Sequence, residues 1–212
     1  MLELSLRRDI ISIARSMNEI GLNQGTSGNV SVRHGDGILI TPSGLPYDRC
    51  CPEDIVRLQM DGTAEGIRKP SSEWLLHLDI YRTALDARAI LHAHPPWCTT
   101  LACLDREIPP FHYMVAMAGG DTIRCAPYAL FGSRELSSHV NAALESRTAC
   151  LMSHHGMVCY AENLEKVLGL AIEVENLARV YCQALQLGEP SLLDGDQMNE
   201  VLAKFADYRS CS

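Results

Sequence analysis

Two histidines separated by one residue are the strongest chemical signal in this 212-residue sequence. His92 and His94 lie at the end of a short apolar run that a Pro-Pro pair stops. In a strand, residues two apart point to the same face, so both imidazoles would lie on one side of the strand end. Imidazole nitrogens are common zinc ligands, and this spacing therefore predicts two ligands of a metal site.

Two further segments could complete that site. The pair His154-His155 follows a second apolar run, and only one member of an adjacent pair can face the same side as the first two imidazoles. Glu73 begins a predicted helix, where the helix dipole favours a carboxylate. His77, four residues later on this helix, could ligate together with Glu73, but we interpret it as a histidine packed between the helix and the neighbouring layer.

Three short polar loops could bind an anion: residues 23–29, residues 41–44 and residues 70–72. Backbone N–H groups in such loops, and at the start of a helix, can bind phosphate. No loop matches a Walker A or dinucleotide-binding fingerprint, and each loop alone is commonly only a turn. Together, and with Glu73 directly after the third, they predict a phosphate cradle of neutral donors beside a metal.

Composition excludes several classes of function. The net charge is −8, which argues against broad nucleic-acid binding and against docking on anionic membranes. No stretch has enough uncharged apolar residues to span a bilayer. The nine cysteines are odd in number, include no CxxC pair and follow no apparent secretory signal, so we expect free thiols in a cytoplasmic protein.

The periodicity of apolar residues predicts alternating strands and helices. We expect helices near residues 6–17, 73–85, 134–146, 163–187 and 197–208, and strands near 30–33, 37–41, 55–60, 89–94 and 149–153. Such interleaving is typical of a layered α/β domain, and the tight turns between several strands favour a mixed, largely antiparallel sheet. No linker or repeat interrupts the chain, so residues 1–212 are predicted to form a single domain.

In their order along the chain, these segments resemble the class II aldolase/adducin family over nearly the whole sequence. The matching segments are residues 21–31, 40–44, 70–74, 92–94, 108–120, 126–132 and 154–156. The part from His112-Tyr113 to Phe131-Gly132 favours the aldolase branch over epimerases, dehydratases and adducin-like heads. The segments together are most similar to enzymes that act on L-fuculose 1-phosphate.

The resemblance implies a three-layer α/β/α fold and a set of site residues. The implied zinc ligands are Glu73, His92, His94 and His155, although Mn²⁺, Co²⁺ or Fe²⁺ could also occupy a His-rich site. The implied phosphate-binding residues are Thr26, Asn29, Ser43, Gly44, Ser71 and Ser72. The resemblance further implies that Tyr113 reaches the site of a neighbouring subunit in a homotetramer, and that Phe131 and Tyr208 lie on the aldehyde side.

The implied activity is reversible cleavage of a ketose 1-phosphate to dihydroxyacetone phosphate and a small aldehyde, with zinc as a Lewis acid. Glu73 and Tyr113 would transfer the protons. We expect L-fuculose 1-phosphate, which gives L-lactaldehyde, or alternatively 5-deoxyribulose or 5-methylthioribulose 1-phosphate. The other hypotheses are an epimerase, a dehydratase or a binding module on the same scaffold. Release of dihydroxyacetone phosphate would distinguish the aldolase from these alternatives.

Overall fold

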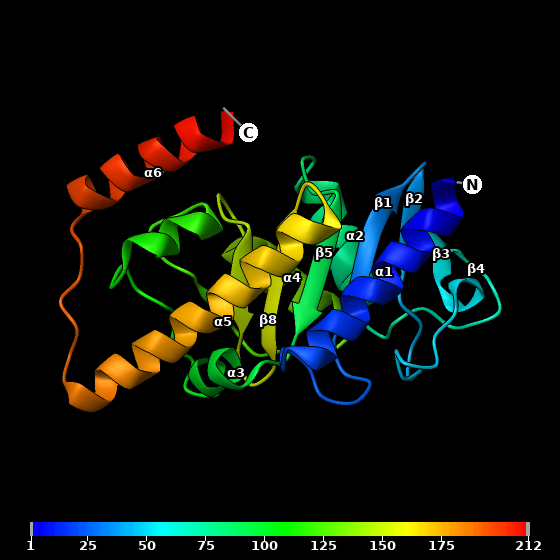
Figure 1. Ribbon diagram of the computed structural model, residues 1–212, viewed down its shortest axis with the longest axis horizontal. Helices are drawn as coiled ribbons and strands as arrows, with labels where there is room; N and C mark the ends of the chain where they lie inside the picture. The colour runs from blue at the N-terminus through cyan, green and yellow to red at the C-terminus, as the bar shows by residue number, and fades with distance from the viewer. Residues whose placement is uncertain (1, 211–212) are drawn as a thin grey trace.

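An eight-stranded sheet forms the centre of the fold in the computed structural model (Figure 1), which describes residues 2–210 and the side chains of residues 2–207. The strand order is β4-β3-β2-β1-β5-β8-β7-β6. The strands are β1 (Asn29–His34), β2 (Gly37–Ile40), β3 (Val56–Gln59), β4 (Ala64–Glu65), β5 (Ala89–Ala93), β6 (Cys125–Ala126), β7 (Ala149–Met152) and β8 (Gly156–Ala161). Within this sheet only β6 and β7 pair in parallel, which confirms the predicted mixed, largely antiparallel sheet.

Helices cover both faces of the sheet. They are α1 (Leu2–Glu19), α2 (Trp74–Thr83), α3 (Pro96–Ala102), α4 (Arg134–Ala143), α5 (Leu164–Leu187) and α6 (Gly195–Ser210), with short 3-10 helices η1 (Pro52–Asp54) and η2 (Tyr113–Ala118). The side chains of α1, α3 and α5 share one hydrophobic core, whereas those of α2 and α4 share a second core. Two cores on opposite sides of one sheet confirm the three-layer α/β/α arrangement.

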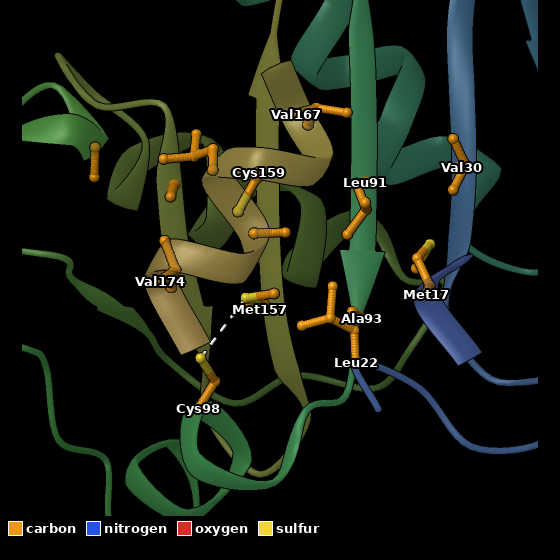
Figure 2. Close-up of a cluster of buried hydrophobic side chains, with 14 of the residues drawn as sticks. Met17, Leu22, Val30, Leu91, Ala93, Cys98, Met157, Cys159, Val167 and Val174 are labelled. Atoms are coloured by element: carbon orange, nitrogen blue, oxygen red, sulfur yellow. Dashed lines mark hydrogen bonds between the residues drawn. The ribbon is translucent and has the colours of Figure 1, made fainter. Parts of the chain in front are cut away.

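The alternation of side chains along the strands separates the two cores. On β5, Leu91 packs into the core with α1, α3 and α5, while its neighbour Ile90 packs into the core with α2 and α4. Figure 2 shows the first core, where Leu91 lies near Cys159 of β8 and Val167 of α5. A strand that is apolar on both faces is fixed in register, so the position of its last residues is fixed as well.

The cysteines serve as buried or surface thiols. Eight of them lie in the described part of the chain and all eight are free, as predicted, while Cys211 lies outside it. Cys98 and Cys159 are fully buried in the first core, and burial raises the pKa of both thiols well above the ordinary range. Neutral, buried thiols of this kind act as small hydrophobic side chains.

Several elements differ from the sequence-based expectations. The structure adds α3, β8 and the short strands β4 and β6, which were not predicted. Glu73, expected as the first residue of a helix, is the N-cap of α2, and the Ser71 hydroxyl accepts a hydrogen bond from its backbone N–H at 3.3 Å. Trp74, the first residue of α2, is only half-buried, whereas Leu76 and Ile80 of this helix are buried in the core.

The C-terminal helix α6 follows an extended segment and lies over η2 (Figure 1). Its Met198 is buried, and the backbone N–H of Leu193 donates to the carbonyl of Pro110 at 2.8 Å. Tyr208 belongs to α6 by its backbone, but its side chain lies outside the described residues. Across residues 2–210, none of the helices combines the length and apolarity needed to cross a bilayer.

Candidate metal centre

The four predicted metal ligands meet near the end of β5, the start of β8 and the start of α2. His92 is the penultimate residue of β5, His94 follows that strand, His155 precedes β8, and Glu73 caps α2. One ligand atom from each residue can be chosen so that all four atoms lie within 4.8 Å of one another. The three imidazole centroids are 4.7 to 4.8 Å apart. The predicted cluster is therefore assembled in one place from segments far apart in the sequence.

The turn between β7 and β8 separates the histidine pair that the sequence left open. His154 has a φ of 53°, a left-handed conformation that few residues other than glycine adopt. This turn directs His155 toward Glu73, with His155 Nε2 at 3.5 Å from Glu73 Oε1. His154 instead lies edge-on to the ring of Tyr128, with centroids 6.1 Å apart. Of the pair, only His155 joins the cluster.

A backbone carbonyl fixes the orientation of His92. Its Nδ1 lies 2.8 Å from the carbonyl oxygen of Met157 on the paired strand β8. A carbonyl can only accept, so Nδ1 carries the hydrogen and Nε2 faces the cluster. A hydrogen bond from the ring nitrogen that does not bind the metal sets the tautomer of metal-binding histidines in this way.

The ligand atoms of the cluster lie so close together that their lone pairs face one another. His92 Nε2 lies 2.7 Å from Glu73 Oε2 and 2.8 Å from His94 Nε2. Glu73 Oε1 is buried and makes no hydrogen bond within the described side chains. A buried carboxylate oxygen without a partner is costly, and a cation between these atoms would remove that cost. Three imidazoles and one carboxylate are a donor set that suits zinc.

The ionisation of the cluster is consistent with metal binding near neutral pH. Burial lowers the pKa of His94 to about 3 and that of His155 to about 4, with the charge of a protonated His92 acting in the same direction. Burial also works against protonation of His92, but the Glu73 carboxylate raises its pKa. Burial opposes ionisation of Glu73, yet the neighbouring histidines hold its pKa well below the usual range. His94 and His155 are thus neutral at pH 7 and offer free lone pairs to a metal.

A cavity of about 370 Å³ opens beside the cluster and brings most of the predicted site residues together. Glu73, His94, His155 and Phe131 line it. All six predicted phosphate-binding residues line it as well: Thr26, Asn29, Ser43, Gly44, Ser71 and Ser72. No lysine or arginine is among the residues that line this cavity within the described chain.

Three residues differ from the rest of the site region. Tyr113 does not line the cavity of its own chain; it lies on η2 with half of its surface exposed. Tyr128 and His154 line the cavity, and no role was predicted for either. The Ala126-Pro127-Tyr128 segment had been noted in the resemblance, so the sequence carried a signal for Tyr128 but none for its place beside His154.

A glycine next to the cluster allows β8 to approach β5 closely. A Cβ atom at Gly156 would clash with the carbonyl oxygen of Ala93 and lie 2.9 Å from Cδ2 of His94. We expect Gly156→Ala to push the two strands apart, lower the free energy of unfolding by about 1–3 kcal/mol and reduce bound zinc well below one per chain.

The matched control is Gly169→Ala, because Gly169 lies in α5 with open space around it. Alanine there should leave zinc content unchanged and should stabilise the helix by up to about 1 kcal/mol. Thermal unfolding and metal analysis of both variants check this, and a Gly156→Ala protein with full stability and full zinc content would contradict the account.

Comparisons with known proteins agree with this geometry. Residues 8–182 match the profile of the Class II Aldolase and Adducin N-terminal domain. A 5-methylthioribulose-1-phosphate/5-deoxyribulose-1-phosphate aldolase of Rhodospirillum rubrum is 52% identical over 205 residues, which cover 97% of this chain and 93% of the relative. An L-fuculose phosphate aldolase of Escherichia coli K12 is 48% identical over 204 residues, which cover 96% and 95% of the two chains.

A solved structure of an L-fuculose 1-phosphate aldolase superposes with a TM-score of 0.92 at 38% identity and covers 95% of this chain and 96% of that chain. The profile match, the two relatives and this fold agree with the predicted resemblance and with the cluster at the end of β5. The chain belongs to the class II aldolase and adducin family, in which it is a metal-dependent class II aldolase, a lyase.

Proposed function

We propose that the protein reversibly cleaves a ketose 1-phosphate to dihydroxyacetone phosphate and a small aldehyde, with zinc bound by Glu73, His92, His94 and His155. The observation that carries this proposal is a single cavity that joins a ligand cluster to a cradle of neutral hydrogen-bond donors. A divalent cation in this cluster would act as a Lewis acid toward the ketose carbonyl. Mn²⁺, Co²⁺ or Fe²⁺ could replace zinc at such a site.

The chain's own residues would bind the phosphate and move the protons. Hydroxyl, amide and backbone N–H groups of the three polar loops would hold the phosphate. Cleavage breaks the C3–C4 bond, releases the proton of the C4 hydroxyl and requires a proton at C3. Glu73 is suited to deliver the proton at C3, taken up from solvent, if bound substrate replaces it at the metal, because its Oε1 is buried beside the cavity without a hydrogen-bond partner among the described residues.

Tyr113 is proposed to take the proton of the C4 hydroxyl in a neighbouring subunit. It lies outside the cavity of its own chain and exposes 51% of its surface. Leu130 and Phe131 are also exposed apolar side chains. These observations support active sites that are completed at the interfaces of a homotetramer. Phe131 would lie on the aldehyde side of such a site, and so would Tyr208, as the resemblance implies.

The substrate is proposed to be a deoxy ketose 1-phosphate with an apolar end. L-Fuculose 1-phosphate and 5-deoxyribulose 1-phosphate each end in a methyl group, and 5-methylthioribulose 1-phosphate ends in a methylthio group. The aromatic rings of Tyr128 and Phe131 line the cavity and would suit such an end. Relatives of both substrate groups are similarly identical to this chain, at 52% and 48%, so identity alone favours neither substrate.

A coupled assay for dihydroxyacetone phosphate over these three ketose 1-phosphates tests the proposal. We expect release of dihydroxyacetone phosphate from at least one of them. The kcat/KM values then rank the three substrates, which differ in their apolar ends. Conversion of each ketose phosphate without release of dihydroxyacetone phosphate would instead indicate an epimerase or a dehydratase. A full complement of zinc with no turnover of any of the three would contradict the proposed substrate class.

A further inference from the structure

A chain of buried polar side chains runs from the interior to Glu73, between α2 and β1. In order it comprises Tyr81, Ser31, His77, Asn29 and Glu73, and each of these residues is at most 5% exposed. The Tyr81 hydroxyl lies 3.0 Å from Ser31 Oγ, which lies 2.6 Å from His77 Nδ1. His77 Nε2 lies 2.5 Å from Asn29 Oδ1, and Asn29 Nδ2 lies 3.4 Å from Glu73 Oε2.

The chemistry of each partner fixes the direction of this chain. A carboxylate only accepts, so the NH₂ group of Asn29 faces Glu73 and its Oδ1 faces His77. Because Oδ1 also only accepts, Nε2 of His77 carries the hydrogen. In a neutral imidazole Nδ1 then accepts, from the hydroxyl of Ser31. The Ser31 oxygen can then accept from the Tyr81 hydroxyl, which also lies 3.4 Å from the Arg88 carbonyl oxygen. The donors of Ser31, His77 and Asn29 are thus all directed toward the site.

The Glu73 carboxylate thus selects one of the two orientations of the Asn29 amide, and the Nε2–H of His77 holds the amide in it. In the other orientation, Oδ1 would face the Glu73 carboxylate, and the NH₂ group would face the Nε2–H of His77. Acceptor would meet acceptor and donor would meet donor, in a buried place where unpaired polar groups are costly. In the observed orientation, one N–H of Asn29 faces Glu73 Oε2 while the other stays available to the cavity that Asn29 lines.

We propose that His77 is a positioning residue for the metal centre, which acts through Asn29 to hold Glu73 by its Oε2 and leave Oε1 free. This inference rests on the proposed function in that Oε1 is there the oxygen that serves the proton transfer. The side chain of His77 does not line the cavity. Within the described chain, it makes no hydrogen bond to the side chain of any of the four predicted metal ligands. Its effect is therefore transmitted, and it is distinct from ligation by His77, which the sequence left as an alternative.

Two substitutions separate positioning from packing. In His77→Gln, the terminal amide nitrogen can take the place of Nε2–H and donate to Asn29. In His77→Asn, the shorter side chain can reach Ser31 but not Asn29. Loss of such contacts to metal ligands changes activity or metal affinity by about 10–100-fold. For His77→Asn, we expect proton exchange at C3 of dihydroxyacetone phosphate to fall by a factor in that range, with kcat affected more than KM. For His77→Gln, we expect exchange near the wild-type rate.

The Co²⁺-loaded protein supplies a readout that does not need turnover. Its visible absorption reports the arrangement of the ligands, so His77→Asn should shift the bands and His77→Gln should restore them. His139→Asn is the control, because His139 is half-buried on α4, away from the cluster, and its Nδ1 lies 3.2 Å from the Pro127 carbonyl oxygen. It should leave both the spectrum and the exchange rate unchanged.

A double-mutant cycle with Asn29→Ala tests the route. His77→Asn should add less than about 2-fold to the loss of exchange once Asn29 is absent. Equal spectra and rates for wild type and His77→Asn, or equal losses in the Asn and Gln variants, would overturn the positioning role. If wild type releases no dihydroxyacetone phosphate but the Co²⁺ spectra shift as expected, the proposed function fails while the positioning of Glu73 stands.

Discussion

Glu73→Gln is expected to abolish most proton exchange at C3 of dihydroxyacetone phosphate while the protein stays folded. Glutamine keeps the size of the side chain and an oxygen that can contact the metal, but it cannot accept and return a proton. Positioned general acids and bases contribute about 10²–10⁴-fold, so we expect exchange and cleavage to fall by factors in that range. Exchange of solvent deuterium into dihydroxyacetone phosphate, followed by NMR, measures the first of these rates directly.

The control for this variant is Glu165→Gln, an equivalent change at an exposed carboxylate in the first turn of α5. It should retain wild-type exchange. Metal analysis separates the two roles assigned to Glu73, as a base and as a metal ligand. If Glu73→Gln loses exchange but retains zinc, the loss is that of the base, whereas loss of zinc would show that the ligand was lost. Wild-type exchange in Glu73→Gln would show that another group moves the proton.

His155→Ala is expected to lose bound zinc and, with it, cleavage, whereas His154→Ala is expected to retain one zinc per chain. Of these adjacent residues, only His155 faces Glu73, and His154 faces Tyr128. Lewis-acid stabilisation is worth several kcal/mol, and each 1.36 kcal/mol is tenfold in rate, so cleavage should fall by at least about 100-fold in His155→Ala.

The two variants change the same kind of side chain at neighbouring positions, so their stabilities provide an internal comparison. Zinc content measured by mass spectrometry, together with the rate of dihydroxyacetone phosphate release, checks the pair. Equal zinc content in both variants would remove His155 from the ligand set. Loss of zinc from His154→Ala alone would mean that the turn between β7 and β8 presents the other histidine to the metal.

Short-range patterns in the sequence were sufficient to predict the central part of the metal site. The spacing of His92 and His94 predicts two imidazoles on one face at a strand end, and β5 ends at Ala93 between them. Apolar residues at helical spacing predicted α1 and α5 within a few residues of their observed ends. These features depend on local periodicity, which a single sequence contains.

Other features of the site depend on contacts between distant segments and could not be predicted in this way. The choice between His154 and His155 is decided by a left-handed residue in a three-residue turn before β8, a strand that was itself not predicted. The hydrogen bond between Asn29 and His77 joins residues 48 positions apart and has no local signature. The proposed place of Tyr113 in a neighbouring subunit rests on the family resemblance, because no local pattern around this residue indicates a partner chain.

The proposal as a whole depends on a metal at the meeting point of β5, β8 and α2. The most direct measurement is a titration of metal-free protein with Zn²⁺ during which release of dihydroxyacetone phosphate is followed. The account predicts a rate at least about 100-fold below that of the loaded enzyme before zinc is added, and a rise that ends at one equivalent per chain. Full activity in the metal-free protein would contradict it.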